Sequence, residues 1–298
     1  MRIEKLVVIG VGLIGASCAL ATRRTGVTRE IVGIGRSREN LDRALAKGAI
    51  DRALMLTDDW TREIRDADFV LIAIPVAQYR DTLAALAPAL PAGAVVTDAG
   101  STKQDVVAAA RETLGDRLSG FVPAHPVAGS ERSGADAADA NLFVGRQVIV
   151  TPLPETSPSA LQCVERFWTM CGARVARLDA ARHDRILAAV SHLPHLIAFA
   201  LVAELASRPD SAEYLGNAGS GFRDFTRIAG SSPEMWRDVA LANRDALLVE
   251  LAAFRSAIDA LILSIEHADR AALDTMLERA ATMRRRWGDT APGVGTPR

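Results

Sequence analysis

The stretch Lys5-Leu-Val-Val-Ile-Gly10-Val-Gly12-Leu-Ile-Gly15 joins a largely β-branched run to three glycines at the spacing G-x-G-x-x-G, and a helical pattern follows over residues 16–24. In a strand, turn and helix of this kind, the first glycine allows the tight turn and the second lets backbone amides approach a pyrophosphate. The third lets the helix pack closely on the strand. We therefore expect a dinucleotide at the helix N-terminus. The expected contacts come from Gly10, Gly12, Leu13, Ile14 and Gly15.

The next predicted strand, residues 30–35, ends on Arg36-Ser37-Arg38, which bears on the choice of dinucleotide. An NAD-specific site places Asp or Glu here to hold the free ribose 2′-hydroxyl, whereas a guanidinium and a hydroxyl suit a 2′-phosphate. We expect NADP to be preferred, with NAD as the other possible cofactor. The structural alternative is that Ser37 caps the following helix and that both arginines face solvent.

The run 68–75 is almost continuously apolar and ends at Pro75, which is typical of a strand buried on both faces of a parallel sheet. Ligands bind at the carboxyl edge of such sheets, so Pro75 is a further candidate contact for the cofactor.

Strand and helix patterns alternate along the first part of the chain. This predicts an α/β, doubly wound dinucleotide-binding domain over residues 1–178. Alanine and leucine then dominate and β-branched runs are scarce, which predicts an all-α domain over residues 179–289. Two Pro and two Gly near the end predict a flexible tail over residues 290–298.

The composition argues against several classes of function. The 298 residues contain 35 Lys and Arg against 36 Asp and Glu, a formal net charge of -1, so we expect no nucleic acid and no anionic membrane as partner. Cys18, Cys163 and Cys171 show no C-x-x-C spacing, and the histidines and carboxylates show no ligand spacing. We therefore expect no disulfide framework and no metal, and a reducing cytoplasm fits.

The most apolar long segment, residues 186–206, is interrupted by polar residues and by Pro194. A membrane span needs about 20 consecutive apolar residues, so we expect a buried helix here. The N-terminus runs directly into a strand pattern and lacks the apolar region and cleavage site of a signal peptide.

The stretch His125-Pro-Val-Ala-Gly-Ser-Glu-Arg-Ser-Gly134 follows an apolar run over residues 120–124 and carries a candidate base. An imidazole with a pKa near about 6.5 is neutral at working pH and can accept a proton. A lone histidine after a strand is usually structural, so its function needs support from the rest of the chain. Ser101 and Gln104 have the spacing of a capping box for the helix that follows.

Five motifs spread over residues 5–245 together resemble the prephenate/arogenate (cyclohexadienyl) dehydrogenase family. They are Gly10-Val-Gly-Leu-Ile-Gly-Ala-Ser17, Asp98-Ala-Gly-Ser-Thr-Lys103, His125-Pro-Val-Ala-Gly-Ser-Glu131 with Ser133-Gly134, Ser191-His-Leu-Pro-His195, and Gly221-Phe-Arg-Asp-Phe-Thr-Arg-Ile-Ala229 followed by Ser231-Ser-Pro-Glu-Met-Trp236.

The resemblance implies an oxidative decarboxylation in tyrosine biosynthesis. Hydride leaves the hydroxyl-bearing ring carbon of prephenate or arogenate for NAD(P)+, a base takes the hydroxyl proton, and the ring carboxylate departs as carbon dioxide. The resemblance implies that His125 is the base and that Ser101 bonds the same hydroxyl and orients His125. Ser130 matches a position that helps to hold the substrate.

In the helical domain the resemblance assigns Arg227 to a substrate carboxylate, His195 to the side-chain end of the substrate, and Asp224 to support of the arginine. Asp224 and Arg227 are three residues apart and could instead form a plain surface pair. His192 and His195 flank Pro194 and could instead line a helix kink.

The resemblance also implies a homodimer through the helical domain, with Trp236 close to the site of the partner. The amount of apolar residue over 186–206 agrees with a second copy covering this region. Trp236 could equally be a core aromatic. For His183, as for His192, a functional and a structural role both stay open.

Two other functions compete with this hypothesis. A dehydrogenase of the β-hydroxyacid type would share the architecture, but such enzymes usually use a lysine base in the helical domain, and residues 186–206 contain no lysine. A catalytically silent NADP-binding sensor would bind the cofactor without turnover.

Overall fold

The computed structural model describes residues 2–130 and 132–290, and residues 291–298 of the expected tail lie outside the described residues. The chain divides into two compact units, Met1–Arg244 and Asp245–Arg298.

A six-stranded parallel sheet forms the centre of the first unit, with the strand order β3-β2-β1-β4-β5-β6. The strands are β1 (Ile3–Ile9), β2 (Thr28–Gly35), β3 (Arg52–Met55), β4 (Phe69–Ile72), β5 (Val95–Asp98) and β6 (Phe121–Val122). The order reverses between β1 and β4, which is where a doubly wound sheet binds its ligand. The predicted α/β fold class is confirmed.

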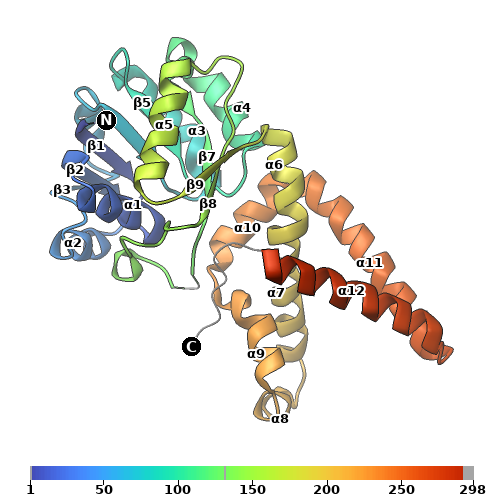
Figure 1. Cartoon of the computed structure of the whole chain (residues 1–298). Helices are drawn as coiled ribbons and strands as arrows, with labels where there is room; N and C mark the ends of the chain where they lie inside the picture. Colours follow the sequence, from blue (N-terminus) through green and yellow to red (C-terminus); the bar gives the residue numbers. More distant parts are fainter. Residues whose placement is uncertain (1, 131, 291–298) are drawn as a thin grey trace. The chain divides into compact units, whose positions relative to one another are not determined.

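Helices lie on both faces of the sheet (Figure 1), and the side chains of β1 alternate between two apolar clusters. Leu6 and Val8 face α1 (Leu13–Arg24), α2 (Arg38–Ala46) and α5 (Pro158–Met170). Val7 and Ile9 face the opposite layer, with α3 (Tyr79–Leu86) and α4 (Gln104–Thr113). Because helices cover both faces, β4 and residues 6–9 of β1 are apolar without interruption.

A second sheet of three strands carries the candidate base. It consists of β7 (Ala124–Val127), antiparallel to β8 (Gln147–Val150), and β9 (Arg174–Arg177), parallel to β8. The apolar run over residues 120–124 is not one strand, because the chain leaves the first sheet after β6 and His125 pairs with Ile149 inside β7. Pro123, which has no N–H to donate to a ladder, separates the two strands.

The rest of the first unit is helical, as predicted. The elements are α6 (Ala180–Leu187), a π-helical turn (Ala188–His192), α7 (Leu193–Ala206), α8 (Ser211–Gly216), α9 (Ser220–Thr226), a 3-10 turn (Arg227–Gly230) and α10 (Pro233–Ala242). Asp179 marks the change from strand to helix by accepting the N–H of Arg182 at 2.8 Å, which caps α6. A domain boundary at this position stays a prediction.

The expectation of a buried helix over residues 186–206 is wrong for the single chain. Leu193 and Ala198 are the buried residues of α7, whereas Val190 is 69% and Leu201 36% exposed. Among the described residues, Ala180–Ala206 is also the one helix long and apolar enough to cross a membrane by length and composition, and 28% of its most apolar window is buried. This helix is therefore only partly buried.

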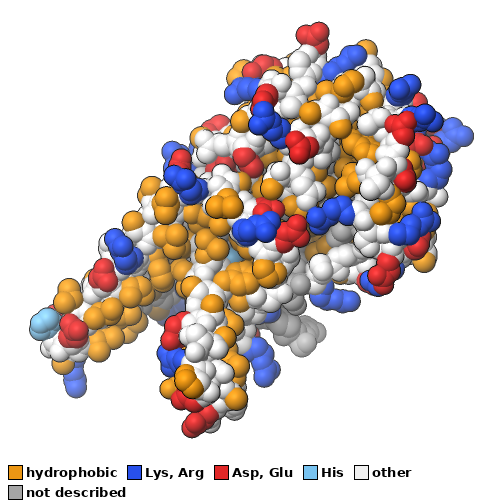
Figure 2. Space-filling model, turned by 180° about the vertical axis from the view of Figure 1, so that it is seen from behind, with side chains coloured by type: hydrophobic (Ala, Val, Ile, Leu, Met, Phe, Trp, Pro, Cys, Tyr) orange, Lys and Arg blue, Asp and Glu red, His pale blue; other side chains and the backbone are white. Residues whose placement is uncertain are grey.

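The second unit consists of two helices, α11 (Arg244–Glu266) and α12 (Arg270–Thr290). The first residue of α11, Arg244, is the last residue of the first unit. Its surface is rich in apolar side chains, and Figure 2 shows hydrophobic side chains gathered along helices of the chain. On α11 the exposed ones are Leu248, Val249, Leu251, Phe254, Ile258, Ile262, Leu263 and Ile265.

The three glycines after β1 meet different surroundings. Gly10 has φ +97°, and a Cβ there would lie 2.2 Å from the carbonyl oxygen of Ala73. A Cβ on Gly15 would lie 2.1 Å from the carbonyl oxygen of Gly10, whereas a Cβ on Gly12 would meet nothing within 4 Å. The fold therefore requires Gly10 and Gly15, and Gly12 leaves space in front of α1.

We predict that Gly15→Ala lowers the free energy of unfolding by about 1–3 kcal/mol or more, because backbone must move to admit the methyl group. Gly12→Ala should keep the melting temperature of the wild type and weaken dinucleotide binding, because its methyl group enters the open space. Thermal unfolding and cofactor titration by fluorescence measure both. Equal loss of stability in the two variants would contradict this division of roles.

Candidate active site

The glycine loop meets the end of β4 at the carboxyl edge of the sheet. Ile9 pairs with Ile72, and Pro75 precedes a short 3-10 turn, Val76–Gln78. The N-terminus of α1 has no side-chain cap, so its amides are free for an anion. Leu13 and Ile14 form the first turn and are half-buried.

At the end of β2, Ser37 caps α2 by accepting the N–H of Asn40 at 3.3 Å. The helix cap expected as the structural alternative is therefore present. The Ser37 hydroxyl can still donate one hydrogen bond. Arg36 lies 3.4 Å from Glu234 of α10, and Arg38 pairs with Asp42. All four of these charged side chains are largely exposed, so each pair contributes little to stability.

His125 lies in a buried chain of hydrogen bonds. Its Nδ1 is 2.9 Å from Nε2 of His183, and Nδ1 of His183 is 2.8 Å from Oδ1 of Asp184. His125 is 8% exposed, His183 0% and Asp184 1%. The candidate base is thus connected to a carboxylate through a second imidazole.

The surroundings keep the imidazole of His125 neutral. Burial lowers the pKa of His125 well below its ordinary value, and His183, Lys103 and His192 lower it further. A neutral imidazole has a free lone pair, which is the form that accepts a proton.

The Ser101 loop is fixed by Asp98 at the end of β5. Asp98 pairs with Lys103, and both side chains are fully buried. Its Oδ2 also accepts the N–H of Gly100 at 2.8 Å, and its Oδ1 accepts the N–H of Ala124 at 2.8 Å. Asp98 therefore connects the loop that holds Ser101 to the strand that holds His125.

The predicted capping box of Ser101 and Gln104 is wrong. Helix α4 begins at Gln104, and its N-cap residue, Lys103, makes no side-chain cap. Asp184 satisfies this terminus instead, since its Oδ1 accepts the N–H of Lys103 and its Oδ2 the N–H of Gln104, each at 2.8 Å. Ser101 is thereby free of a capping role.

His195 and Trp236, two further candidate site residues, contact each other. Their rings stack with centroids 3.7 Å apart and planes at 20°, and Trp236 is buried. Nδ1 of His195 donates to the carbonyl oxygen of Ser191 at 2.8 Å, which leaves Nε2 as an acceptor. Burial lowers the pKa of His195, the bond to Ser191 opposes this, and the charge of Arg227 lowers it further. Arg227 therefore lies close enough to His195 to act on it.

His192 is buried beside the same tryptophan. Its Nδ1 accepts Nδ2 of Asn243 at 3.1 Å, and Asn243 also donates to the carbonyl oxygen of Asp184 at 2.8 Å. Burial lowers the pKa of His192 to about 4. Its ring meets Trp236 edge-on, at 6.0 Å between centroids.

Two predicted substrate residues lie at the surface. Ser130 is exposed after β7, where its Oγ accepts the N–H of Arg132 at 3.2 Å. Asp224 is exposed on α9.

Sequence reasoning left four residues of the buried network out of the site, namely Asp98, Lys103, Asp184 and Asn243. A signal existed for three of them. Asp98 and Lys103 belong to a motif already quoted, and Asp184 follows His183 directly.

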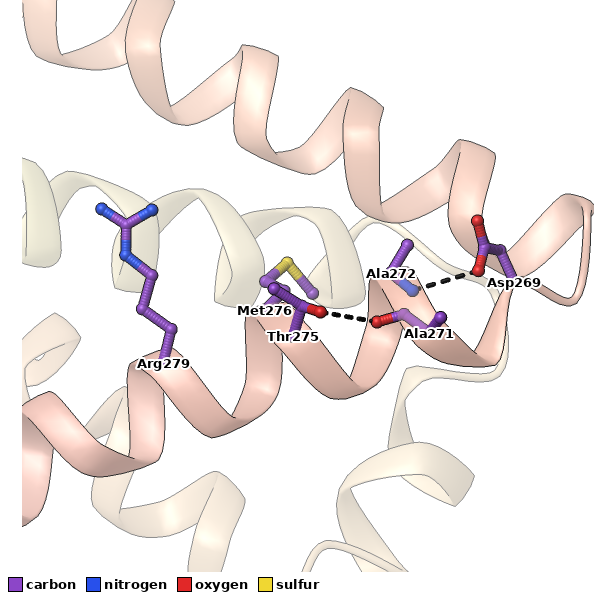
Figure 3. Close-up of a pocket in the computed structure, with 6 residues that line it drawn as sticks. All are labelled: Asp269, Ala271, Ala272, Thr275, Met276 and Arg279. Atoms are coloured by element: carbon purple, nitrogen blue, oxygen red, sulfur yellow. Dashed lines mark hydrogen bonds between the residues drawn. The ribbon is translucent and has the colours of Figure 1, made fainter.

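The second unit has a surface pocket, and Figure 3 shows the side chains that line it. They are Asp269, Ala271, Ala272, Thr275, Met276 and Arg279. All of them lie on or just before α12, and none is a candidate site residue. Within residues 2–130 and 132–290, no group of three or more His, Cys, Asp or Glu side chains is placed to hold a metal ion.

Two family models match successive parts of the chain. The prephenate dehydrogenase nucleotide-binding domain matches residues 18–177, and the prephenate dehydrogenase dimerization domain matches residues 179–279.

Individual relatives agree with these matches. Cyclohexadienyl dehydrogenase of Zymomonas mobilis is 38% identical over 250 residues, which is 82% of this chain and 83% of that protein. Prephenate dehydrogenase of Aquifex aeolicus, solved in complex with hydroxyphenyl propionate and NAD+, has a TM-score of 0.86 at 33% identity and covers 96% of this chain and 99% of its own. Synechocystis arogenate dehydrogenase has a TM-score of 0.76 at 31% identity, with 95% and 100% covered. The chain belongs to the prephenate dehydrogenase family.

Proposed function

We propose that this chain catalyses the oxidative decarboxylation of a cyclohexadienyl acid, prephenate or arogenate, with NAD(P)+ as hydride acceptor. The product is 4-hydroxyphenylpyruvate or tyrosine, so the reaction belongs to tyrosine biosynthesis. The observation that carries the proposal is His125, a buried imidazole held neutral at the strand next to the Ser101 loop. Aquifex aeolicus prephenate dehydrogenase, solved with NAD+ and an aromatic acid, supports both ligand classes.

The glycine loop and α1 fit the pyrophosphate of the cofactor, because Gly12 leaves open space before uncapped amides. When bound, the nicotinamide supplies the site for the hydride. His125 takes the proton of the ring hydroxyl as the hydride leaves, and Ser101 donates a hydrogen bond to the same oxygen and orients the imidazole. The ring then loses its carboxylate as carbon dioxide and becomes aromatic.

The remaining residues hold the substrate. Arg227 binds a substrate carboxylate with Asp224 supporting it, and His195 binds the side-chain end, for which its Nε2 is available. Trp236 keeps His195 in place by stacking, and Ser130 contributes from the loop after β7. A carboxylate that departs as carbon dioxide loses its charge, so Arg227 contributes orientation more than transition-state stabilisation.

The enzyme's location is proposed to be the cytoplasm. Cys18, Cys163 and Cys171 are free thiols, which agrees with a reducing compartment.

We predict that the purified protein reduces NAD(P)+ with prephenate or arogenate and that His125→Asn lowers kcat about 10²–10⁴-fold, because general-base catalysis contributes this much. Cofactor binding measured by fluorescence should stay within about threefold of wild type. The matched control is His267→Asn, since His267 is exposed and hydrogen-bonds its own helix. Cofactor binding without any turnover by the wild type would instead indicate a sensor.

The cofactor preference is proposed to be NADP. Arg36 and Arg38 stand at the end of β2 with Ser37 between them, and their present partners, Glu234 and Asp42, hold them only through exposed pairs. A 2′-phosphate, with its higher charge, competes well against such pairs.

We expect Arg36→Ala to lower kcat/KM for NADP by at least about tenfold and to change kcat/KM for NAD by less than about threefold, because one charged contact to the phosphate is lost. Arg52→Ala is the control, since Arg52 pairs with Glu30 and Glu63 away from this edge. Wild-type kcat/KM for NAD equal to or above that for NADP would refute the preference.

The assembly is proposed to be a homodimer through the helical region. The matched dimerization domain covers residues 179–279, and this range contains the exposed apolar side chains of α7 and α11. An apolar surface of this extent is normally covered by another chain.

Sedimentation should give twice the mass of the chain, and Ile258→Asp should shift the protein toward the monomer, because a charge cannot be buried unpaired in an apolar contact. Asp259→Lys, a change at the next exposed position of α11, is the control and should remain dimeric. A wild-type monomer at micromolar concentration would exclude the proposed assembly.

A further inference from the structure

Asp184, like Asp98, accepts three hydrogen bonds in the site. Its Oδ1 accepts both the Nδ1–H of His183 and the N–H of Lys103, and its Oδ2 accepts the N–H of Gln104, all at 2.8 Å. Burial opposes its ionisation, but the bonds from His183 and from these amides outweigh burial and lower the pKa of Asp184. Asp184 is therefore an ionised, fully buried hydrogen-bond acceptor.

The ionised state of Asp184 determines where the protons of the two imidazoles lie. An ionised carboxylate only accepts, so Nδ1 of His183 carries a hydrogen, and in the neutral form of this ring Nε2 has the lone pair. That lone pair faces Nδ1 of His125 at 2.9 Å, so Nδ1 of His125 must donate. The lone pair of His125 is consequently on Nε2, the nitrogen that this chain of bonds does not use.

We propose that His183 and Asp184 are positioning residues for the base, which keep the lone pair of His125 on Nε2 and offset the charge that arrives with the substrate proton. The proposal rests on the proposed function, in which His125 is the base. Neither residue needs to touch the substrate, because both act through Nδ1 of His125.

The proton balance is simple. The O–H bond of the substrate breaks and an N–H bond forms at Nε2 of His125, which becomes an imidazolium. An unpaired charge is costly in a buried site, and the nearby Lys103 and the neutral His192 do not compensate it. Asp98 is already paired with Lys103. Asp184 is the carboxylate joined to His125 through His183, so it offsets the new charge.

The same carboxylate also holds the Ser101 loop. Lys103 and Gln104, whose amides it binds, follow Ser101 by two and three residues. One side chain of α6 thus fixes both the base and the loop of its proposed hydrogen-bonding partner.

The first test compares His183→Leu with His183→Gln. Leu removes the acceptor for Nδ1–H of His125, and we expect kcat to fall about a hundredfold or more with KM within about threefold of wild type. The amide oxygen of Gln can accept the same proton, so His183→Gln should recover at least about tenfold of this loss. Both variants leave the bonds of Asp184 to α4 in place.

Nitrogen-15 NMR of the histidine rings tests the proton positions without any turnover. In the wild type, Nδ1 of His125 should be protonated and Nε2 unprotonated at neutral pH. His183→Leu should give a mixture of both tautomers. This measurement separates failure of the present proposal from failure of the proposed function, because it needs neither substrate nor cofactor.

Asp184→Asn removes the charge and retains the size of the side chain. The imidazolium of His125 is then less stable, so its pKa falls and the acid limb of kcat/KM should move to lower pH, with a lower plateau of kcat. Asp179→Asn, the same change at the cap of the same helix, should leave the limb and kcat unchanged. If Asp184→Asn does not fold, the His183 variants and the NMR spectrum still test the positioning role of this pair.

Three results would each overturn the proposal. They are a wild-type kcat in His183→Leu, equal losses in His183→Leu and His183→Gln, and a wild-type His125 protonated on Nε2. Equal losses would assign His183 to packing alone.

Discussion

The buried ion pair of Asp98 and Lys103 is the interaction on which the site depends. Removing two charges from water is costly, and breaking such a pair leaves an uncompensated charge at a cost of about 3–5 kcal/mol. Two further hydrogen bonds to Asp98, from the amides of Gly100 and Ala124, offset the cost of burying its charge. The end of β5, the Ser101 loop and the start of β7 are therefore fixed together, although β5 and β7 belong to different sheets.

The same pair has an electrostatic consequence for the base. The charge of Lys103 is among the causes that lower the pKa of His125, after burial and His183. Lys103, whose ion pair with Asp98 fixes the Ser101 loop, thus also helps to keep the imidazole of His125 neutral. His192, with a pKa of about 4, is neutral near pH 7 as well. The site therefore needs a counter-charge when a proton arrives at His125, and Asp184 is the carboxylate bonded to His183, which contacts His125.

The sequence predicted those features that follow from local patterns. The glycine spacing, the apolar run to Pro75 and the alternation of strands and helices depend on neighbours in the chain, and they indicated the doubly wound sheet. His125 was predicted to be the base because it lies in one of the five motifs that together resemble the family. The helical second half was predicted from its composition for the same reason.

The features that sequence reasoning missed depend on contacts between distant residues. Ser101 and Gln104 satisfied the rule for a capping box, but Asp184, 80 residues away, supplies a charged acceptor for the amides of Lys103 and Gln104. A local rule cannot show that a stronger distant acceptor is present. The expected burial of α7 was wrong for a related reason, since burial depends on what covers an apolar helix and not on the helix alone.

A contact between distant residues also joins the glycine loop to the segment that follows the strand of the base. Asn40 of α2 donates from Nδ2 to the carbonyl oxygen of Val11 in the glycine loop at 2.6 Å, and its Oδ1 accepts the N–H of Ala135 at 2.8 Å. Ala135 lies in the segment after β7. Asn40, Asp98 and Asp184 thus hold the site from three different elements, each with both ends of its polar group engaged. Since a catalytic geometry must hold to within about 0.5 Å, such doubly engaged side chains on rigid elements are what allow loops from two sheets and a helix to act as one site.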